Sequence, residues 1–125
     1  MPKTILDTNF LMIPGQFKVD IFDDMLGLAE GEVCVLDLSV KELEKLSETG
    51  NTNDRTAAKI ALELLKRKHL KVVPGSSENS VDDAIIEALE PGDTLCTQDK
   101  ELKQRAKDKG IKVVTLKNKS HLGLV

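Results

Sequence analysis

The sequence has very few aromatic residues. It contains no tryptophan and no tyrosine, and its three phenylalanines are Phe10, Phe17 and Phe22. Proteins that hold single-stranded nucleic acid by base stacking need aromatic side chains along the binding groove. We therefore do not expect a stacking platform for bases.

Cysteines and long apolar segments are also scarce. The two cysteines, Cys34 and Cys96, each lie inside a short apolar run, which is typical of buried side chains and not of metal ligands or a disulfide. No apolar run approaches the roughly 18 residues that a membrane-spanning helix needs, and the N-terminus lacks the pattern of a signal peptide. We expect an intracellular, cytoplasmic protein that does not contact membranes.

The chain lacks a strong excess of positive charge. Its net charge is −3 and its pI is about 5.4, which argues against binding nucleic acid by electrostatics alone. The charge is unevenly spread, because residues 99–125 contain eight lysines and arginines but three acids. This basic segment is either a solvated helix surface or a contact for a polyanion.

Short apolar segments alternate with helical patterns along the whole chain. Segments of strand length occur at residues 4–6, 33–36, 70–73, 94–97 and 112–116. Apolar residues at helical spacing occur at 21–29, 40–46, 57–65, 81–89 and 102–106, and Gly110 is expected to end the last helix. The alternation predicts one α/β domain over residues 1–125, with a parallel sheet of about five strands and helices on both faces.

Acidic residues follow the predicted strands. In parallel sheets of this kind the ligand site lies beyond the carboxyl ends of the strands. Acids occur there after four strands, at Asp7, Glu42, the pair Asp82 and Asp83, and Asp99. Four strand ends are therefore expected to present carboxylates to one crevice.

Each acid also has a purely structural interpretation. Ser39 with Glu42, and Ser80 with Asp83, fit or approximate the capping box at the start of a helix. Asp99 is a good N-cap for the helix that follows it. Taken singly, these acids are better explained as helix caps than as catalytic groups.

Taken together, the acids indicate a metal site. Two unit charges about 4 Å apart repel by roughly 4 kcal/mol at an effective dielectric constant near 20, so several converging carboxylates favour a bound cation. Neither His69 nor His121 lies near these turns in the sequence. Ligation by oxygen alone suits Mg²⁺ or Mn²⁺ better than zinc or copper.

Other doubly wound folds fit the same positions poorly. A haloacid-dehalogenase-type phosphatase needs an acid two residues after Asp7, where this chain has Asn9. A response-regulator receiver needs a phosphate-accepting aspartate at the end of the third strand, where Pro74 and Gly75 stand. No glycine-rich phosphate loop follows the first strand. With these folds set aside, the acids at the strand ends are best interpreted as a site for metal-dependent chemistry on phosphodiester bonds.

The residues resemble those of the PIN-domain ribonucleases. The resemblance runs from about residue 4 to residue 116, and it is carried by "LDTNFL", "VKELEKL", "DDAIIEAL" and "TQDKELKQRAKDKGIKVV" in that order. The chain looks similar to stand-alone archaeal members and to PIN nucleases of small-subunit ribosomal RNA processing, and more distantly to VapC toxins. This resemblance implies a PIN-like fold with a Rossmann-like arrangement of three layers.

The resemblance implies a Mg²⁺- or Mn²⁺-dependent ribonuclease, with an endonuclease favoured. It implies catalytic and metal-binding roles for Asp7, Glu42, Asp83 and Asp99, with Asp82 as a further metal ligand in some members. We favour Asp83 over Asp82 because it directly precedes the apolar stripe of its helix. Asn9 and Thr97 match polar residues that steady the site. The basic residues nearest in sequence for holding RNA are Lys100, Lys103, Arg105 and Lys107.

Two alternatives stay open at the level of the sequence. The chain could be a catalytically weak PIN fold that binds RNA or assists assembly, with a ribosome-assembly partner, or it could be the toxin of a toxin–antitoxin pair. The apolar loop "FLMIP" and the helix at 21–29 could supply a homodimer or partner surface. The RNA substrate, the number of metal ions and the oligomeric state are not determined by the sequence.

Overall fold

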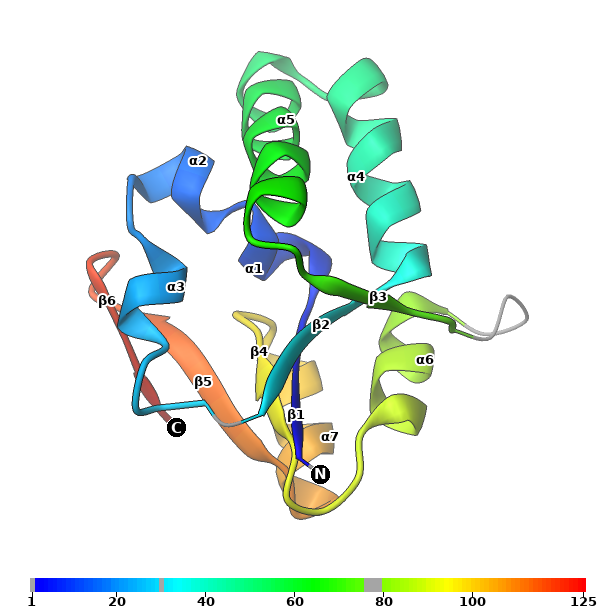
Figure 1. Cartoon of the computed structure of the whole chain (residues 1–125), viewed down its shortest axis with the longest axis vertical. Coiled ribbons are helices and arrows are strands. Elements are labelled where there is room, and N and C mark those ends of the chain that lie inside the picture. The colour runs from blue at the N-terminus through cyan, green and yellow to red at the C-terminus, as the bar shows by residue number, and fades with distance from the viewer. Residues whose placement is uncertain (1, 30, 76–79) are drawn as a thin grey trace.

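The computed structural model describes residues 2–29, 31–75 and 80–125, which form a six-stranded sheet with helices on both faces (Figure 1). The strand order is β3-β2-β1-β4-β5-β6. The strands are β1 (Lys3–Leu6), β2 (Glu32–Leu36), β3 (Lys71–Val73), β4 (Thr94–Cys96), β5 (Lys112–Lys117) and β6 (His121–Leu124). The first five pair in parallel, as the sequence predicted.

The sixth strand was not predicted. β6 pairs antiparallel with β5, so the sheet is mixed and mostly parallel. The turn between them places Asn118 and Lys119 at positive φ, 53° and 56°. Lysine rarely adopts this conformation, and the four-residue strand includes Gly123, so neither the turn nor the strand carries the usual hairpin signal.

Seven helices occupy the described residues. They are α1 (Thr8–Leu11), α2 (Ile13–Phe17), α3 (Ile21–Asp24), α4 (Asp37–Thr49), α5 (Thr52–Arg67), α6 (Val81–Ala88) and α7 (Lys100–Asp108). The short helices α1 and α2 were not expected, and α3 is shorter than the predicted 21–29 pattern. Gly110 follows α7 with φ 82°, which confirms it as the terminating glycine.

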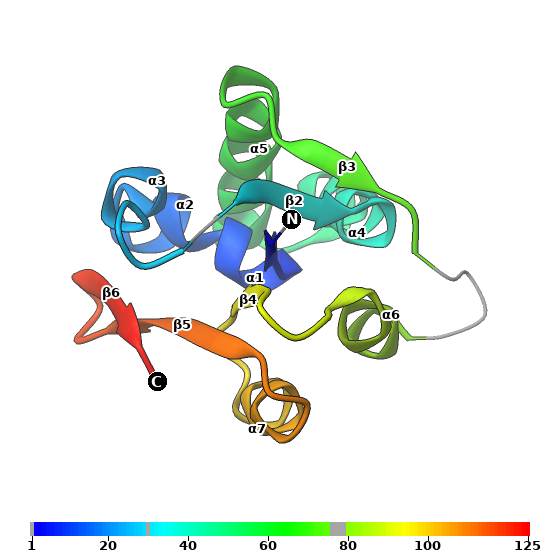
Figure 2. The same ribbon diagram turned by 60° about the horizontal axis from the view of Figure 1, so that its bottom comes forward.

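Alternate residues of each strand face opposite sides of the sheet. Leu6, Val35 and Cys96 belong to one buried cluster, whereas their chain neighbours Ile5, Leu36 and Leu95 belong to a second. The first cluster includes side chains from α5, and the second includes side chains from α6 and α7. Figure 2 shows α6 and α7 on the opposite side of the sheet from α5, so the predicted three-layer arrangement is confirmed.

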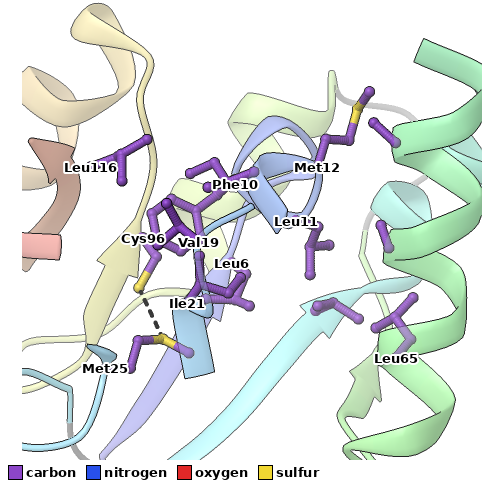
Figure 3. Close-up of a cluster of buried hydrophobic side chains, with 14 of the residues drawn as sticks. Leu6, Phe10, Leu11, Met12, Val19, Ile21, Met25, Leu65, Cys96 and Leu116 are labelled. Atoms are coloured by element: carbon purple, nitrogen blue, oxygen red, sulfur yellow. Dashed lines mark hydrogen bonds between the residues drawn. The ribbon is translucent and has the colours of Figure 1, made fainter. Parts of the chain in front are cut away.

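The larger core contains one of the two cysteines. Cys96 lies among Leu6, Phe10 and Ile21, with its Sγ 3.8 Å from Sδ of Met25 (Figure 3). Both cysteines are free and buried, and burial raises the pKa of each thiol. Their interpretation as buried hydrophobic side chains is confirmed.

The strand order fixes the position of the site. From β1 the chain passes to β2 on one side, and it later enters β4 on the other side of β1. The carboxyl ends of β1 and β4 therefore adjoin at the point where the strand order reverses, which is where open α/β sheets bind ligands. Among the described residues, no helix is long and apolar enough to cross a bilayer.

Candidate active site

A polar pocket of about 170 Å³ lies beyond the carboxyl ends of β1 and β4. Its walls come from the start of α1, the middle of α4, the start of α6 and the turn before α7. The lining residues are Asp7, Thr8, Asn9, Glu42, Leu46, Val81, Asp82, Ile85 and Asp99. We call this hollow the acidic pocket, since it gathers one carboxylate from each of four chain segments.

Asp7 is the most buried acid of the acidic pocket. It caps α1 by accepting a hydrogen bond from the Phe10 amide at 2.7 Å, and its other carboxylate oxygen accepts one from the Thr97 hydroxyl. Burial raises the pKa of Asp7 to about 6, although these two hydrogen bonds oppose the rise. The charges of Asp82 and Asp99 raise it further.

Glu42 reaches the acidic pocket from α4 and is not a helix cap. The predicted capping box at Ser39 is wrong, because α4 begins at Asp37 and Ser39 lies inside the helix. The Ser39 hydroxyl is buried without a hydrogen-bond partner within the described part of the chain. The Glu42 carboxylate instead accepts a hydrogen bond from the Thr8 hydroxyl at 2.5 Å.

The adjacent acids of α6 face different neighbours. Ser80 caps this helix by accepting a hydrogen bond from the Asp83 amide at 3.1 Å, as its position in the sequence predicted. Asp82 lines the acidic pocket, whereas the Asp83 carboxylate pairs with Arg105 of α7 at 2.8 Å. The preference for Asp83 over Asp82 therefore finds no support in the geometry.

Asp82 also responds electrostatically to the other acids. Partial desolvation raises its pKa, and the negative charges of Asp99 and Glu42 add to the rise, while Arg105 opposes it. Asp7 and Asp82 thus both resist ionisation. A cation in the acidic pocket would favour the charged form of each.

The turn between β4 and α7 holds Asp99. Asp99 caps α7 by accepting from the Leu102 amide at 2.7 Å, and its own amide donates to the Thr97 hydroxyl oxygen at 3.1 Å. Its interpretation as an N-cap is confirmed, and it lines the acidic pocket as well. Capping and pocket lining are therefore compatible uses of one carboxylate.

Two polar residues of the site were not predicted from the sequence. Thr8 donates to Glu42, and Gln98 fixes the turn after β4. The Gln98 Oε1 atom accepts from the Thr115 hydroxyl at 2.7 Å and from the Leu116 amide at 2.5 Å. Both residues are next to acids that the sequence singled out, and that adjacency was the signal available.

The predicted RNA-binding residues all belong to α7. Arg105 is held beside the site by Asp83. Lys100 directly follows Asp99 and is exposed, as is Lys107, while Lys103 is half-buried. None of the four lines the acidic pocket. The helix therefore borders the site without entering it.

The acidic pocket fits a hard cation by its donor chemistry. Its charged groups are all carboxylates, and neither histidine lines it. Among residues 2–29, 31–75 and 80–125, no three acidic, histidine or cysteine side chains are grouped as in a formed metal centre. Sharing one ion would require the carboxylates to draw together by side-chain rotation.

Comparison with known proteins identifies a family and several relatives of the chain. Residues 4–119 match the family model described as a PIN like domain. Ribonuclease VapC9 of Archaeoglobus fulgidus is 38% identical over 114 residues, covering 90% of this chain and 82% of the relative. The rRNA-processing protein fcf1 of Schizosaccharomyces pombe is 29% identical over 120 residues, which cover 91% of this chain and 58% of that protein.

A solved structure agrees with the sequence comparison. The PIN domain endonuclease Utp24 superposes with a TM-score of 0.76 at 27% identity, covering 98% of this chain and 90% of that one. VapC9 shares more identical residues than fcf1, although the motifs led us to expect VapC proteins to be the more distant. The chain belongs to the PIN-like domain family and is homologous to the VapC ribonucleases and to the rRNA-processing PIN nucleases Fcf1 and Utp24.

Proposed function

We propose that this chain is a ribonuclease that depends on Mg²⁺ or Mn²⁺ and cleaves RNA internally. The observation that carries the proposal is the acidic pocket, which carboxylates from four segments line at the switch point of the sheet. Relatives named ribonuclease and endonuclease support the same chemistry. In this proposal residues 1–125 act as one PIN domain in the cytoplasm.

We assign the metal ligands to Asp7, Glu42, Asp82 and Asp99. Asp82 replaces Asp83 in this set because Asp82 lines the acidic pocket and Asp83 is paired with Arg105. Asp83 then acts indirectly, by holding α7 against α6. The pKa of Asp7 and that of Asp82 are both raised, which is the electrostatic condition that a bound dication relieves.

The protein groups have distinct tasks in the proposed reaction. A bound ion would lower the pKa of water and offset charge on the phosphate under attack. Thr97 and the Phe10 amide hold the Asp7 carboxylate, and Thr8 holds that of Glu42. Asn9 offers an uncharged amide at the pocket wall. Hydrolysis would leave a 5′-phosphate and a 3′-hydroxyl.

RNA must be held mostly outside the acidic pocket, since uncompensated carboxylates repel its backbone. We assign this task to the cations of α7, with Lys100 nearest to Asp99 in the chain. Lys103 and Lys107 extend the same helix, and Arg105 remains in place through Asp83.

Two cellular roles are compatible with this chemistry. The likeness to fcf1 and to Utp24 supports ribosomal RNA processing, with assembly factors as partners. The higher identity to VapC9 supports a toxin that an antitoxin holds inactive. Cleavage of ribosomal RNA precursors at a single position would favour the role in ribosomal RNA processing. Growth arrest when the chain is expressed, relieved by co-expression of a neighbouring gene, would favour the role of a toxin.

The proposal is tested by digestion of structured and single-stranded RNA with Mg²⁺ or Mn²⁺, and with EDTA as the metal-free control. We expect internal cuts that need the ion and are lost in Asp7→Asn. Asp23→Asn, an exposed acid outside the acidic pocket, is the matched control and should cleave normally. Equal cleavage by parent and Asp7→Asn would reveal a contaminating nuclease and remove support for the proposal.

A further inference from the structure

The outer edge of β3 is open to other segments. β3 (Lys71–Val73) is the first strand of the sheet, and among the described residues it pairs with β2 alone. Figure 2 shows it at the margin of the sheet, with β2 between it and β1. A strand at an edge presents a row of backbone N–H and C=O groups with which a further strand can pair. The fold therefore offers a place here where an extended segment can be added.

An apolar hollow of about 440 Å³ borders this edge. It lies between the first turn of α4, the last turns of α5 and β3. Most of its lining is apolar, and these residues are Val40, Leu62, Leu65, Leu70 and Val72. Val72 keeps 50% of its surface exposed, and Leu62 and Leu70 are only partly buried. Exposed apolar surface of this kind marks sites where other chains bind. We call this hollow the β3 groove.

The pleat of β3 turns Val72 to the side of the sheet on which the β3 groove lies. Val72 is paired with Val35, which belongs to the buried cluster that includes side chains of α5. Val73 faces the other way and packs against the second cluster. A strand added beside β3 would continue this alternation, because successive side chains of a strand point to opposite faces. Every second side chain of such a strand would therefore be directed over the β3 groove.

The charged groups around the β3 groove are basic. Lys66 and His69 line it, and none of the described lining residues is an acid. Residues 66–71 carry four lysines and arginines and one histidine. Lys71 and Arg67 each pair with an acid, at 3.5 and 3.6 Å, but Lys66 has no ion-pair partner within the described part of the chain. The groove therefore favours a ligand with negative charge.

We propose that the β3 groove and the free edge of β3 together bind an extended segment of a partner protein, apolar at alternate positions and flanked by Asp or Glu. The segment would add a seventh strand to the sheet through backbone hydrogen bonds to β3. Its apolar side chains would cover Val72, and its acidic flanks would lie near Lys66. Because β3 has three residues, the backbone contact is short. The apolar side chains and the charges then supply most of the affinity.

RNA and a second copy of this chain fit the same place less well. None of the three phenylalanines lines the β3 groove, so bases would find no ring on which to stack. A second copy could pair its own β3 across a two-fold axis, but the basic residues 66–71 of both copies would then be brought together. An acid-flanked segment avoids this repulsion and fills the apolar hollow.

The proposed peptide site does not rest on the proposed nuclease function. Of the described residues, none lines both the β3 groove and the acidic pocket. Peptide binding and RNA cleavage are therefore separate measurements on the same chain. Failure of the one would leave the other untouched.

Selection from a displayed library of random nonapeptides against the full chain gives the first test. We expect the enriched peptides to alternate apolar and polar residues between acidic flanks. Their affinity should fall about tenfold or more for Val72→Glu, which puts a charge beside the apolar hollow. The matched control is Leu124→Glu, which changes a residue 44% exposed on β6 at the opposite edge of the sheet. It should bind the peptides like the parent.

The selection also has outcomes that contradict the proposal. The proposal is wrong if no peptide is enriched, or if the enriched peptides bind Val72→Glu as tightly as the parent chain. Circular dichroism checks that Val72→Glu is folded, as its half-exposed position leads us to expect. If it is not folded, Val72→Thr, which keeps a β-branched side chain but adds a hydroxyl, takes its place and should weaken binding several-fold.

A pair of matched lysines tests the charge of the site. Lys66 and Lys107 are both exposed and both lie in the last turn of a helix, so Lys66→Glu and Lys107→Glu make the same local change. Lys66→Glu should weaken the selected peptides several-fold and reduce the salt dependence of their binding, whereas Lys107→Glu should change neither. If Lys66→Glu instead weakens binding of a labelled RNA and leaves peptide binding unchanged, the basic residues bind RNA and the proposal is wrong.

Backbone N-methylation of a selected peptide tests the added strand itself. Successive amides of a strand point to opposite sides, so one alternate set would donate to β3 and the other would face solvent. Methyl groups on the first set should abolish binding, and on the second set they should leave the affinity within about threefold. If both methylated peptides bind like the unmodified one, no strand is added to β3 and the proposal is overturned.

Discussion

At the scale of single residues, the site depends on how each carboxylate is held. Asp7 is nearly enclosed and accepts two hydrogen bonds, yet its pKa is raised to about 6. Desolvation of the charged form, together with repulsion by Asp82 and Asp99, therefore outweighs the stabilisation that the hydrogen bonds from the Phe10 amide and the Thr97 hydroxyl provide. Asp7 is a group that weakens the metal-free fold at neutral pH and gains from a cation.

Asp7→Asn should therefore stabilise the metal-free protein. The folded-state pKa of about 6 exceeds the ordinary 3.8, so the folded chain binds more protons and its stability falls as pH rises through this interval. Asn caps a helix as well as Asp does. Above pH 6 the variant should gain up to about 3 kcal/mol, since one pKa unit corresponds to about 1.4 kcal/mol.

Urea unfolding with EDTA at pH 4.5 and pH 7.5 measures this effect. The parent should lose stability between the two values, while Asp7→Asn should change much less. With millimolar Mn²⁺ the order should reverse, because a ligand that binds the folded state stabilises the parent. Identical pH dependence of the two proteins would contradict the account of Asp7.

The two acids of α6 provide a second prediction at this scale. Asp82→Asn should weaken Mn²⁺ binding by tenfold or more, because it removes a charged oxygen from the acidic pocket. Asp83→Asn should leave Mn²⁺ affinity within about threefold, since Asp83 faces Arg105, and should lower stability by at most about 1 kcal/mol for a partly exposed pair. Calorimetric titration with Mn²⁺ compares them, and the opposite order would restore Asp83 as the ligand.

At the scale of elements, a turn between β4 and α7 connects the site to the edge of the sheet. Gln98 lies in this turn between Thr97 and Asp99, and its side chain is bonded to β5 at Thr115 and Leu116. β5 in turn pairs with β6, the strand that the sequence did not reveal. The last hairpin of the chain therefore supports the placement of two site residues.

Gln98→Ala should disturb both stability and the site. It leaves the Leu116 amide and the Thr115 hydroxyl without their acceptor, which costs about 2 kcal/mol. The freed turn should also weaken Mn²⁺ binding several-fold, because Asp99 is less well held. Gln104→Ala, which removes an exposed hydrogen bond to Asp108, is the control and should change neither quantity by much. Unchanged Mn²⁺ affinity in Gln98→Ala would limit Gln98 to a structural role.

Helix starts show where pattern reading succeeds and where it fails. Ser80 and Asp99 were correctly predicted as caps, because a cap side chain needs only the amides of the next turn. Ser39 fitted the same pattern but lies inside α4, which begins directly after β2 at Asp37. The Asp37 carboxylate accepts instead from the Gly75 amide at 2.9 Å, a contact 38 residues away that no local pattern contains.

At the scale of the whole molecule, the two faces of the sheet carry different cation-bearing helices. α7 lies on the face that includes α6, and α5 lies on the other (Figure 2). If α7 holds RNA, its lysines and those of α5 should have unequal effects on RNA affinity although they change the net charge equally. The comparison distinguishes direct contacts between α7 and RNA from a general effect of the protein's net charge on RNA binding.

Replacing Lys100, Lys103 and Lys107 by Gln should weaken RNA binding and reduce its salt dependence. Each lost phosphate contact lowers the slope of log affinity against log salt by about 0.7 for single strands. The matched control replaces Lys59 and Lys66 of α5 and Lys68, which directly follows this helix, by Gln and should keep the parent slope. Fluorescence anisotropy of a labelled RNA at several salt concentrations compares them. If both triple variants show equal slopes of log affinity against log salt, the cations of α7 form only a solvated surface and do not bind RNA.

The sequence by itself determined the alternation of strands and helices, the parallel pairing of the first five strands, and the family to which the chain belongs. It could do so because apolar periodicity and residues at strand ends are local properties, and because Asp7, Glu42 and Asp99 follow their strands at fixed short distances. The tertiary structure alone decided which of Asp82 and Asp83 enters the acidic pocket, because that depends on where α7 places Arg105. It also decided the antiparallel β6 and the hydrogen bonds by which Gln98 attaches the turn after β4 to β5. Each of these is a contact between segments distant in the chain, and its energy depends on positions that only the packed fold brings together.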